Sequence, residues 1–265
     1  MSTNRIEARL LELKNKNEKA FITYITAGLP DMDKTKEILK AQENTTDVIE
    51  LGIPFSDPIA DGPVIQQASY EAILNGATIK KTFGLLSSMR KEGFETPIVF
   101  MLYYNTVINY GIKAFVEECR NSGVDGLIIP DLPYEEQEAI SKELEGDDRT
   151  ILIQLVSPVS AKRIDKILDG ARGFVYCVSS MGVTGQAADF HREVMNYLKS
   201  VKDVSKIPVM MGFGIRTAKD VAPMKDIIDG AIVGSHFINL MRENNFAPKA
   251  AEEYTATFKK ELNEL

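Results

Sequence analysis

The stretch that decides the fold is residues 48–65, VIELGIPFSDPIADGPVI, in which an apolar strand gives way to a loop. One carboxylate, Glu50, lies inside the strand, and burying it in ionised form without a partner costs several kcal/mol. We therefore expect Glu50 to be paired, protonated or turned toward a cavity. Three prolines, a glycine and two aspartates, Asp57 and Asp61, follow within residues 53–63 and predict a stiff, irregular loop.

Each of these carboxylates also has a purely structural interpretation. Asp57 and Asp61 can form turns in which the side chain binds its own backbone, and Glu50 can make a local salt bridge. For a single aspartate in such a loop, the turn is the more common role. Glu50 differs, because glutamate suits strands poorly and is rarely fully buried. A carboxylate in a strand, with others on the loop after it, is also how an α/β enzyme assembles acid and base groups.

Outside this stretch, the chain repeats the arrangement of an apolar strand followed by a helix. The strand segments are nearly continuous apolar runs, which are typical of a parallel sheet buried on both faces. The expected strands are residues 20–28, 47–52, 96–102, 126–129, 150–156, 173–178, 207–211 and 230–234. The expected helices are residues 2–15, 31–40, 66–76, 78–91, 111–121 and 235–242, others beginning near Tyr134, Ser160, Asp189 and Thr217, and a last one from Pro248 onward.

About eight strand–helix units in 265 residues predict an α/β fold, a (β/α)₈ TIM barrel with an extra N-terminal helix and an extra C-terminal helix. A doubly wound open sheet is the structural alternative, but no G-x-G-x-x-G fingerprint follows the first strand. No linker, low-complexity segment or block of like charge interrupts the pattern. We therefore expect a single domain over residues 1–265.

The composition is that of an ordinary globular protein, with 44% hydrophobic and 26% charged residues. The formal net charge of -7 argues against a nucleic-acid-binding surface, although backbone amides can still bind an anionic substrate. Two cysteines, Cys119 and Cys177, lie far apart without metal-ligand spacing, which suits a reducing compartment. The N-terminus is too charged for a signal peptide, and no apolar run could span a bilayer. We expect a cytoplasmic protein without a metal site.

In a TIM barrel the active site lies at the C-terminal ends of the strands, and glycine-bearing loops follow the last three expected strands. Loops after the seventh and eighth strands commonly bind phosphate, because glycine lets backbone N–H groups approach the anion. Gly214, Gly234 and Ser235 are placed for this role, and residues 182–185, GVTG, are expected to close over them as a mobile lid. The alternative is that these glycines merely end strands.

Other catalytic arrangements find no support in the sequence. His191 and His236 lie on expected helices and are not paired, and there is no zinc cluster, Walker motif or Ser-His-Asp order. No lysine lies near the C-terminal end of an expected strand as a candidate for a Schiff base. A phosphorylated substrate acted on by carboxylate acid and base groups is the chemistry that remains.

Over nearly the whole chain, the motifs closely resemble those of the tryptophan synthase alpha subunit family. The resemblance rests on FITYITAGLP at residues 21–30, ELGIPFSDPIADGP at 50–63, DLP at 131–133, GVTG at 182–185, GFGI at 212–215 and GS at 234–235. The run at residues 50–63 is the most specific of these. The resemblance implies cleavage of indole-3-glycerol phosphate to indole and glyceraldehyde 3-phosphate, a retro-aldol reaction.

The resemblance also implies a role for each matching residue. Glu50 matches the general acid/base that protonates indole C3 and then takes the glycerol hydroxyl proton. Asp61 matches the carboxylate that accepts the indole N–H and favours the positive tautomer. The other matches are substrate contacts at Tyr24, Ile65, Met101, Tyr176 and the lid residue Thr184, and a phosphate cradle at Gly185, Gly214, Gly234 and Ser235.

A partner and its cofactor are implied in the same way. The family works with a beta subunit that holds pyridoxal phosphate and consumes indole, in an alpha2beta2 tetramer, whereas this chain is expected to carry no cofactor of its own. The contact with the beta subunit is expected at Pro54, Phe55, Asp57, Pro58 and Asp131.

Three other interpretations stay open at this point. The chain could be a stand-alone indole-releasing lyase of the same family, or a weakly catalytic subunit that mainly activates its partner. It could also be a different phosphate-handling barrel, such as an epimerase or isomerase of sugar phosphates.

Overall fold

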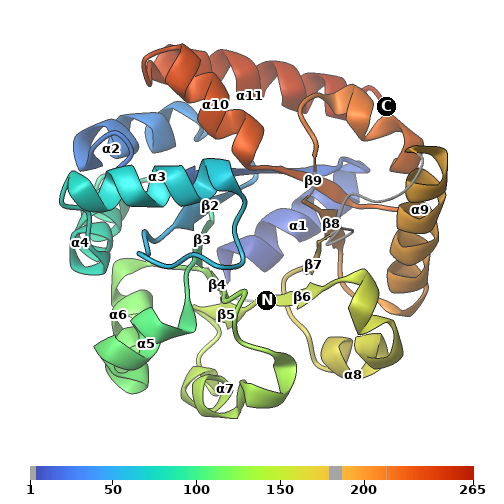
Figure 1. Ribbon diagram of the computed structural model, residues 1–265, viewed down its shortest axis with the longest axis horizontal. Helices are drawn as coiled ribbons and strands as arrows, with labels where there is room; N and C mark the ends of the chain where they lie inside the picture. Colours follow the sequence, from blue (N-terminus) through green and yellow to red (C-terminus); the bar gives the residue numbers. More distant parts are fainter. Residues whose placement is uncertain (1–3, 179–186, 213) are drawn as a thin grey trace.

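Parallel strands form a ring at the centre of the computed structural model, which describes residues 4–178, 187–212 and 214–265 (Figure 1). The strands are β1 (Ala20–Thr26), β2 (Val48–Gly52), β3 (Ile98–Met101), β4 (Gly126–Ile128), β5 (Ile151–Leu152), β6 (Gln154–Val156), β7 (Val175–Cys177), β8 (Val209–Met211) and β9 (Gly230–Val233). They pair in the order β5-β4-β3-β2-β1-β9-β8-β7-β6.

The ring closes through the segment that contains β5 and β6. Only Ile153 separates these two strands, and its N–H donates to the carbonyl of Leu127 at 2.9 Å. β5 pairs with β4, whereas β6 pairs with β7, so one continuous stretch of chain joins both ends of the sheet. The sequence predicts this stretch as a single strand at residues 150–156, and the predicted TIM barrel is confirmed.

Helices form an outer ring around the strands (Figure 1). The helices of this ring are α2 (Met32–Ala41), α3 (Pro63–Leu74), α4 (Ile79–Lys91), α5 (Tyr104–Tyr110), α6 (Ile112–Ser122), α7 (Glu138–Leu144), α8 (Ile164–Leu168), α9 (Ala187–Val204), α10 (Ser235–Glu243) and α11 (Pro248–Asn263), whereas α1 (Arg5–Lys16) lies outside the ring. Short 3-10 turns add η1 (Tyr134–Glu136), η2 (Pro158–Arg163), η3 (Ala218–Asp220) and η4 (Ala222–Met224). Within the described ranges, no helix is long and apolar enough to cross a membrane.

The segment after β8 differs from the sequence prediction. A helix is expected near Thr217, but the chain forms only the two short turns η3 and η4. The carboxylate of Asp220 accepts the N–H groups of Arg216 and Thr217 at 2.9 and 2.8 Å, which holds a tight turn. Pro223 follows within η4 and supplies no N–H with which a helix could continue.

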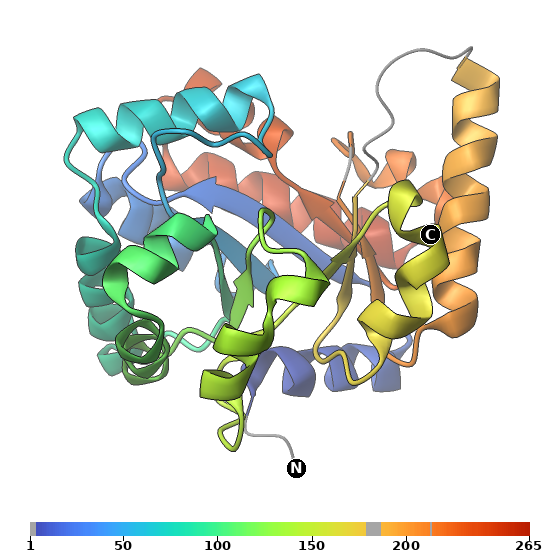
Figure 2. The ribbon, with the colours of Figure 1, turned by 60° about the horizontal axis from the view of Figure 1, so that its bottom comes forward.

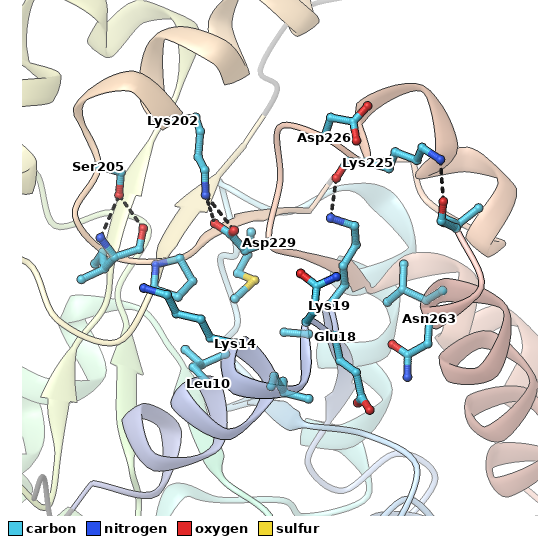
Figure 3. A pocket seen from close by; sticks show the side chains of 18 of the residues that line it. Leu10, Lys14, Glu18, Lys19, Lys202, Ser205, Lys225, Asp226, Asp229 and Asn263 are labelled. Carbon is cyan, nitrogen blue, oxygen red and sulfur yellow. Dashed lines mark hydrogen bonds and ion pairs between the residues drawn. The ribbon is translucent and has the colours of Figure 1, made fainter.

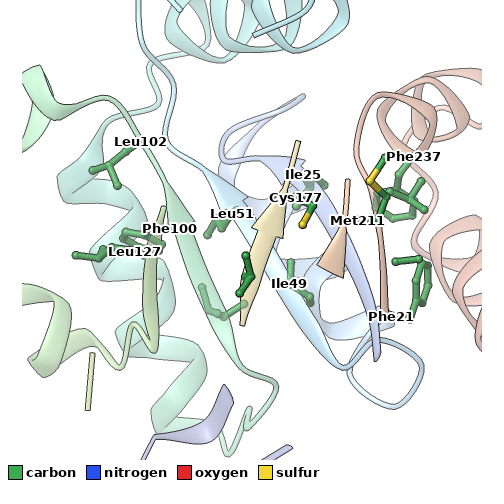
Figure 4. Close-up of a cluster of buried hydrophobic side chains, with 14 of the residues drawn as sticks. Phe21, Ile25, Ile49, Leu51, Phe100, Leu102, Leu127, Cys177, Met211 and Phe237 are labelled. Atoms are coloured by element: carbon green, nitrogen blue, oxygen red, sulfur yellow. The ribbon is translucent and has the colours of Figure 1, made fainter. Parts of the chain in front are cut away.

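The strands bury side chains on both faces, because successive residues point to opposite sides. The outer layer packs between strands and helices (Figure 4) and includes Phe21, Ile49, Leu51, Phe100, Leu127, Met211 and Phe237. The inner layer fills the barrel with residues such as Ile22, Val48, Val99, Met210 and Ile232. This two-sided burial explains why the strand segments are continuous apolar runs in the sequence.

Helix α1 covers one end of the barrel (Figure 2). Its apolar residues Ile6, Leu10 and Leu13 are buried and belong to the same cluster as the inner layer of the strands. Asn4 caps the helix by accepting the N–H of Ile6, and its amide group donates to the carbonyl of Asp125 just before β4. The N-terminal ends of the strands are thus covered, which leaves the C-terminal ends for a site.

Three aspartates at this covered end hold neighbouring strands in register. Each lies directly before a strand and accepts an N–H at the start of a paired strand, at 2.7 to 2.8 Å: Asp47 from Phe21, Asp125 from Ile98 and Asp229 from Val209. Their carboxylates also form salt bridges: Asp47 with Arg9 and Lys259, Asp125 with Arg5 and Arg90, and Asp229 with Lys202. The first two of these aspartates are almost completely buried.

Candidate functional site

Glu50 lies in the middle of β2 and points into the barrel, in register with Tyr24 of β1 and Val99 of β3. Alternation along the strand decides this direction, since Ile49 and Leu51 pack in the outer layer. The side chain is fully buried, and neither carboxyl oxygen has a hydrogen-bond partner among the described residues. Burial raises the pKa of Glu50 to about 8. Glu50 is therefore mainly protonated at neutral pH and can donate a proton to a ligand in the barrel.

Asp61 lies on the loop that follows β2 and is half-buried. Its carboxylate accepts a hydrogen bond from the hydroxyl of Tyr103 at 3.0 Å, rather than forming a turn with its own backbone. Burial raises the pKa of Asp61 to about 6, and the Tyr103 hydrogen bond limits this rise. Near pH 7 the site thus holds one ionised carboxylate and one protonated carboxyl, a division that suits acid–base catalysis.

Tyr24 and Tyr176 bring two hydroxyl groups to the same region from β1 and β7. Burial first, and then the negative charges of Asp61 and Glu50, raise the pKa of both tyrosines, so both stay neutral. Glycines make room for their rings. A Cβ atom on Gly52 would lie 2.0 Å from the Tyr24 hydroxyl oxygen, and one on Gly212 would lie 2.5 Å from that of Tyr176.

An apolar wall adjoins these polar groups. Tyr24 forms a buried cluster with Leu29 of the loop after β1, Ala68 of α3 and Ile238 of α10. Ile65 and Met101, which the sequence analysis assigns to the substrate site together with Tyr24, pack against this cluster from α3 and from the end of β3. Met101 also contacts the inner cluster that contains Tyr176. The wall can therefore bind a flat apolar ligand beside Glu50.

The expected phosphate-binding residues lie where β8 and β9 end. These strands are paired neighbours, so the loops that carry Gly214 and Gly234 leave the barrel side by side. Gly234 precedes Ser235, the first residue of α10, where the first N–H groups of a helix are free to bind an anion. A Cβ atom on Gly234 would lie 3.6 Å from that of Tyr24, which places this helix start next to the apolar wall. Thr184 and Gly185 lie outside the described residues, as does the rest of the expected lid.

The residues expected to contact a partner lie on the loop after β2 and on the loop after β4. Phe55 stacks on Tyr103 with ring centroids 5.0 Å apart, and Asp131 accepts the N–H of Tyr104 at 2.9 Å. Two large apolar side chains on this end of the barrel are exposed, Ile59 by 83% and Ile108 by 55%. Among the expected contact residues, Asp57 and Asp131 are exposed, and Pro54, Phe55 and Pro58 are partly buried.

A separate cavity of about 580 Å³ opens at the opposite end of the barrel, beside α1 (Figure 3). Its lysines are partly engaged, since Lys202 pairs with Asp229 at 2.6 Å and Lys19 donates to the carbonyl of Ile228 at 2.8 Å. None of the expected site residues lines this cavity. In the described part of the chain, no group of three or more His, Cys, Asp or Glu side chains could hold a metal ion.

The structure adds Tyr103 to the site, a residue to which no sequence motif assigns a role. It lies two residues after the end of β3 and is 42 residues from Asp61 in the chain, so only the fold brings the two together. The one signal in the sequence is its place at the C-terminal end of an expected strand, where barrel enzymes collect functional groups. That signal applies equally to its neighbours and does not single Tyr103 out.

Comparisons with known proteins identify the family to which this barrel belongs. The family model of the tryptophan synthase alpha chain matches residues 10–265. The tryptophan synthase alpha chain of Lachnospira eligens is 63% identical over 262 residues, which cover 98% of this chain and 99% of that protein. The chain is also similar to the crystal structure of tryptophan synthase subunit alpha from Legionella pneumophila, with a TM-score of 0.88 and 32% identity over 100% of both chains. The crystal structure of tryptophan synthase from M. tuberculosis, in its open form with BRD0059 bound, is similar with a TM-score of 0.86 and 29% sequence identity. The match covers 98% of this chain and 99% of that chain.

Proposed function

The chain belongs to the tryptophan synthase alpha chain family and is a lyase that cleaves indole-3-glycerol phosphate, and on this basis we propose which residues carry the reaction. The observation that carries the proposal is the contrast between two carboxyl groups at one end of the barrel. Glu50 is buried without a partner and mainly protonated, whereas Asp61 is hydrogen-bonded and mainly ionised at neutral pH.

Glu50 acts first as the acid. Cleavage of the bond between the indole ring and the glycerol chain requires a proton at indole C3, and a protonated carboxyl inside the barrel supplies it. The resulting carboxylate then accepts the proton of the glycerol hydroxyl as the C–C bond breaks, which releases indole and glyceraldehyde 3-phosphate. The proton given up in the first step is thus replaced in the second, and Glu50 returns to its starting state.

Asp61 stabilises the intermediate stage. Protonation at C3 leaves positive charge on the indole ring nitrogen, and an ionised carboxylate that accepts the N–H lowers the energy of that state. The contribution is large where water is excluded, because the charges then interact in a low dielectric. The expected division of roles therefore follows from the different surroundings of the two groups.

The remaining residues bind the substrate. Tyr24, Ile65 and Met101 flank the indole plane, and Tyr176 orients the substrate beside Glu50. The phosphate is bound at the start of α10 by Gly234 and Ser235, with Gly214 on the neighbouring loop. Thr184 and Gly185 complete this part of the proposal from the sequence alone.

A beta subunit that holds pyridoxal phosphate is the proposed partner, in an alpha2beta2 tetramer. The support in this chain is two exposed apolar side chains at the C-terminal end of the barrel, Ile59 on the proline-rich loop after β2 and Ile108 on α5. A single domain, a cytoplasmic location and the lack of a cofactor in this chain remain predictions.

The test measures indole release by the purified chain, with and without a beta subunit. Asp61→Asn is expected to lose turnover while indolepropanol phosphate, an uncleavable analogue, still binds. The matched control is Asp33→Asn on the exposed face of α2, which should cleave at the wild-type rate. Turnover retained in Asp61→Asn would refute its role, and loss of analogue binding would make it a structural residue.

A further inference from the structure

Tyr103 contacts the site but has no part in the reaction proposed above. It lies two residues after the end of β3 and reaches across to the loop after β2. We propose that Tyr103 is a positioning residue, whose hydroxyl fixes the orientation of the Asp61 carboxylate and favours its ionised form. This inference rests on the proposed role of Asp61, and the experiment below separates the two.

The direction of the hydrogen bonds is determined by the available donors. The N–H of Ala60 donates to the Tyr103 hydroxyl oxygen at 2.9 Å, so the single hydroxyl proton is free to point elsewhere. The other neighbour of this oxygen is the Asp61 carboxylate at 3.0 Å, which accepts that proton. Tyr103 therefore holds the loop through two successive residues, one by its backbone and one by its side chain.

The tyrosine ring is itself held rigidly. It is only 4% exposed, and it stacks on the ring of Phe55 with an angle of 19° between the planes. Its carbonyl accepts the N–H of Thr106 in the first turn of α5, which fixes the backbone. A donor whose position is set by packing holds a carboxylate more accurately than a mobile side chain can.

The electrostatic surroundings make this donor important. The titratable groups around Asp61 and Tyr103 are the tyrosines Tyr103, Tyr24 and Tyr176, all neutral at pH 7, Glu50 deeper in the barrel, and Asp131, which acts on Tyr103. Within the described residues, no salt bridge to Asp61 is present to offset its burial. A hydrogen bond donated to the ionised form lowers the pKa of a carboxyl group. The Tyr103 hydroxyl donates such a bond to Asp61 and so opposes the rise in pKa that burial causes.

Removal of the hydroxyl should therefore change the titration of Asp61. A hydrogen bond to a charged group is worth enough to move a pKa by about one unit or more. In Tyr103→Phe, a rise from about 6 to about 7 lowers the ionised fraction of Asp61 about five-fold at pH 6 and only about 1.1-fold at pH 8. The loss of cleavage should follow this dependence on pH, whereas general damage to the fold would lower the rate equally at every pH.

The experiment compares wild type, Tyr103→Phe and Tyr110→Phe in two measurements. Tyr110 packs its ring against Phe83 and Phe115 and is the matched control, expected to behave as wild type. The first measurement is kcat/KM for indole release from about pH 5.5 to 8. The second is the titration of Asp61 by NMR with ¹³C-labelled aspartate, with the signal assigned from its absence in Asp61→Asn.

An upward move of the Asp61 titration in Tyr103→Phe alone, with the rate loss concentrated at low pH, supports the inference. An unchanged titration, or a loss that is the same at pH 6 and pH 8, overturns it. If Asp61→Asn retains turnover, the proposed function of Asp61 fails instead, while the NMR titration still reports whether Tyr103 controls its carboxylate.

Discussion

Replacement of Glu50 by glutamine is expected to abolish cleavage and at the same time to change how stability depends on pH. The folded-state pKa of about 8 lies above the ordinary value of 4.5, so the folded protein holds this proton more tightly than the unfolded chain. Stability is then fully retained below about pH 4.5, where both states are protonated, and falls as the pH rises toward 8.

The magnitude follows from 1.36 kcal/mol for each unit of pKa difference. Between pH 5 and pH 8 the titration of Glu50 should remove about 3.5 kcal/mol from the free energy of unfolding. Glutamine has nearly the same shape but does not titrate in this range. A buried amide without a partner costs about 1–3 kcal/mol, but this cost is the same at every pH. Glu50→Gln should therefore be slightly less stable than wild type at pH 5 and more stable at pH 8.

Urea unfolding at several values between pH 5 and pH 8 measures this difference directly. Other groups titrate in the same interval, but they do so in both proteins and cancel in the comparison. If the stabilities of wild type and Glu50→Gln change in parallel with pH, Glu50 is not protonated by burial. The argument for its role as the acid would then be lost.

Three further outcomes are expected. The pH profile of kcat/KM should be bell-shaped, rising near pH 6 as Asp61 ionises and falling near pH 8 as Glu50 loses its proton; a flat profile over this range contradicts both assignments. Asp125→Ala should lower the free energy of unfolding, measured in urea, by about 3–5 kcal/mol, because Arg5, Arg90 and the N–H of Ile98 lose this partner. A variant as stable as wild type would show that these interactions are dispensable. Gly212→Ala should displace the Tyr176 hydroxyl and lower stability by about 1–3 kcal/mol; an unchanged melting temperature and KM would show that this close approach has no consequence.

Most of the barrel could be predicted from the chain, because each strand segment is an apolar run whose length and spacing are local properties. The local sequence pattern could not show that the helix expected near Thr217 is absent. Its sequence permits a helix, but the hydrogen bonds of Asp220 and the position of Pro223 favour short turns. The division of one expected strand into β5 and β6 also depends on which neighbour each half meets.

The candidate site shows the same limit. Through its family resemblance, the motif at residues 50–63 predicts that Glu50 and Asp61 are functional carboxylates. The family resemblance implies different roles for the two carboxylates, but the neighbouring residues give no physical reason for the difference. Gly212 appears in the sequence as part of a glycine-rich loop, yet in the structure it accommodates the hydroxyl of Tyr176.

The sequence by itself therefore determined the architecture and the identity of the two carboxylates, because apolar periodicity and a specific motif are written in neighbouring residues. Only the tertiary structure decided their protonation. Glu50 is protonated because the barrel buries it without a partner, and Asp61 is more readily ionised because Tyr103, 42 residues away, donates to it. Burial and electrostatic interactions are sums over residues that are distant in the chain, and they exist only once the barrel has closed.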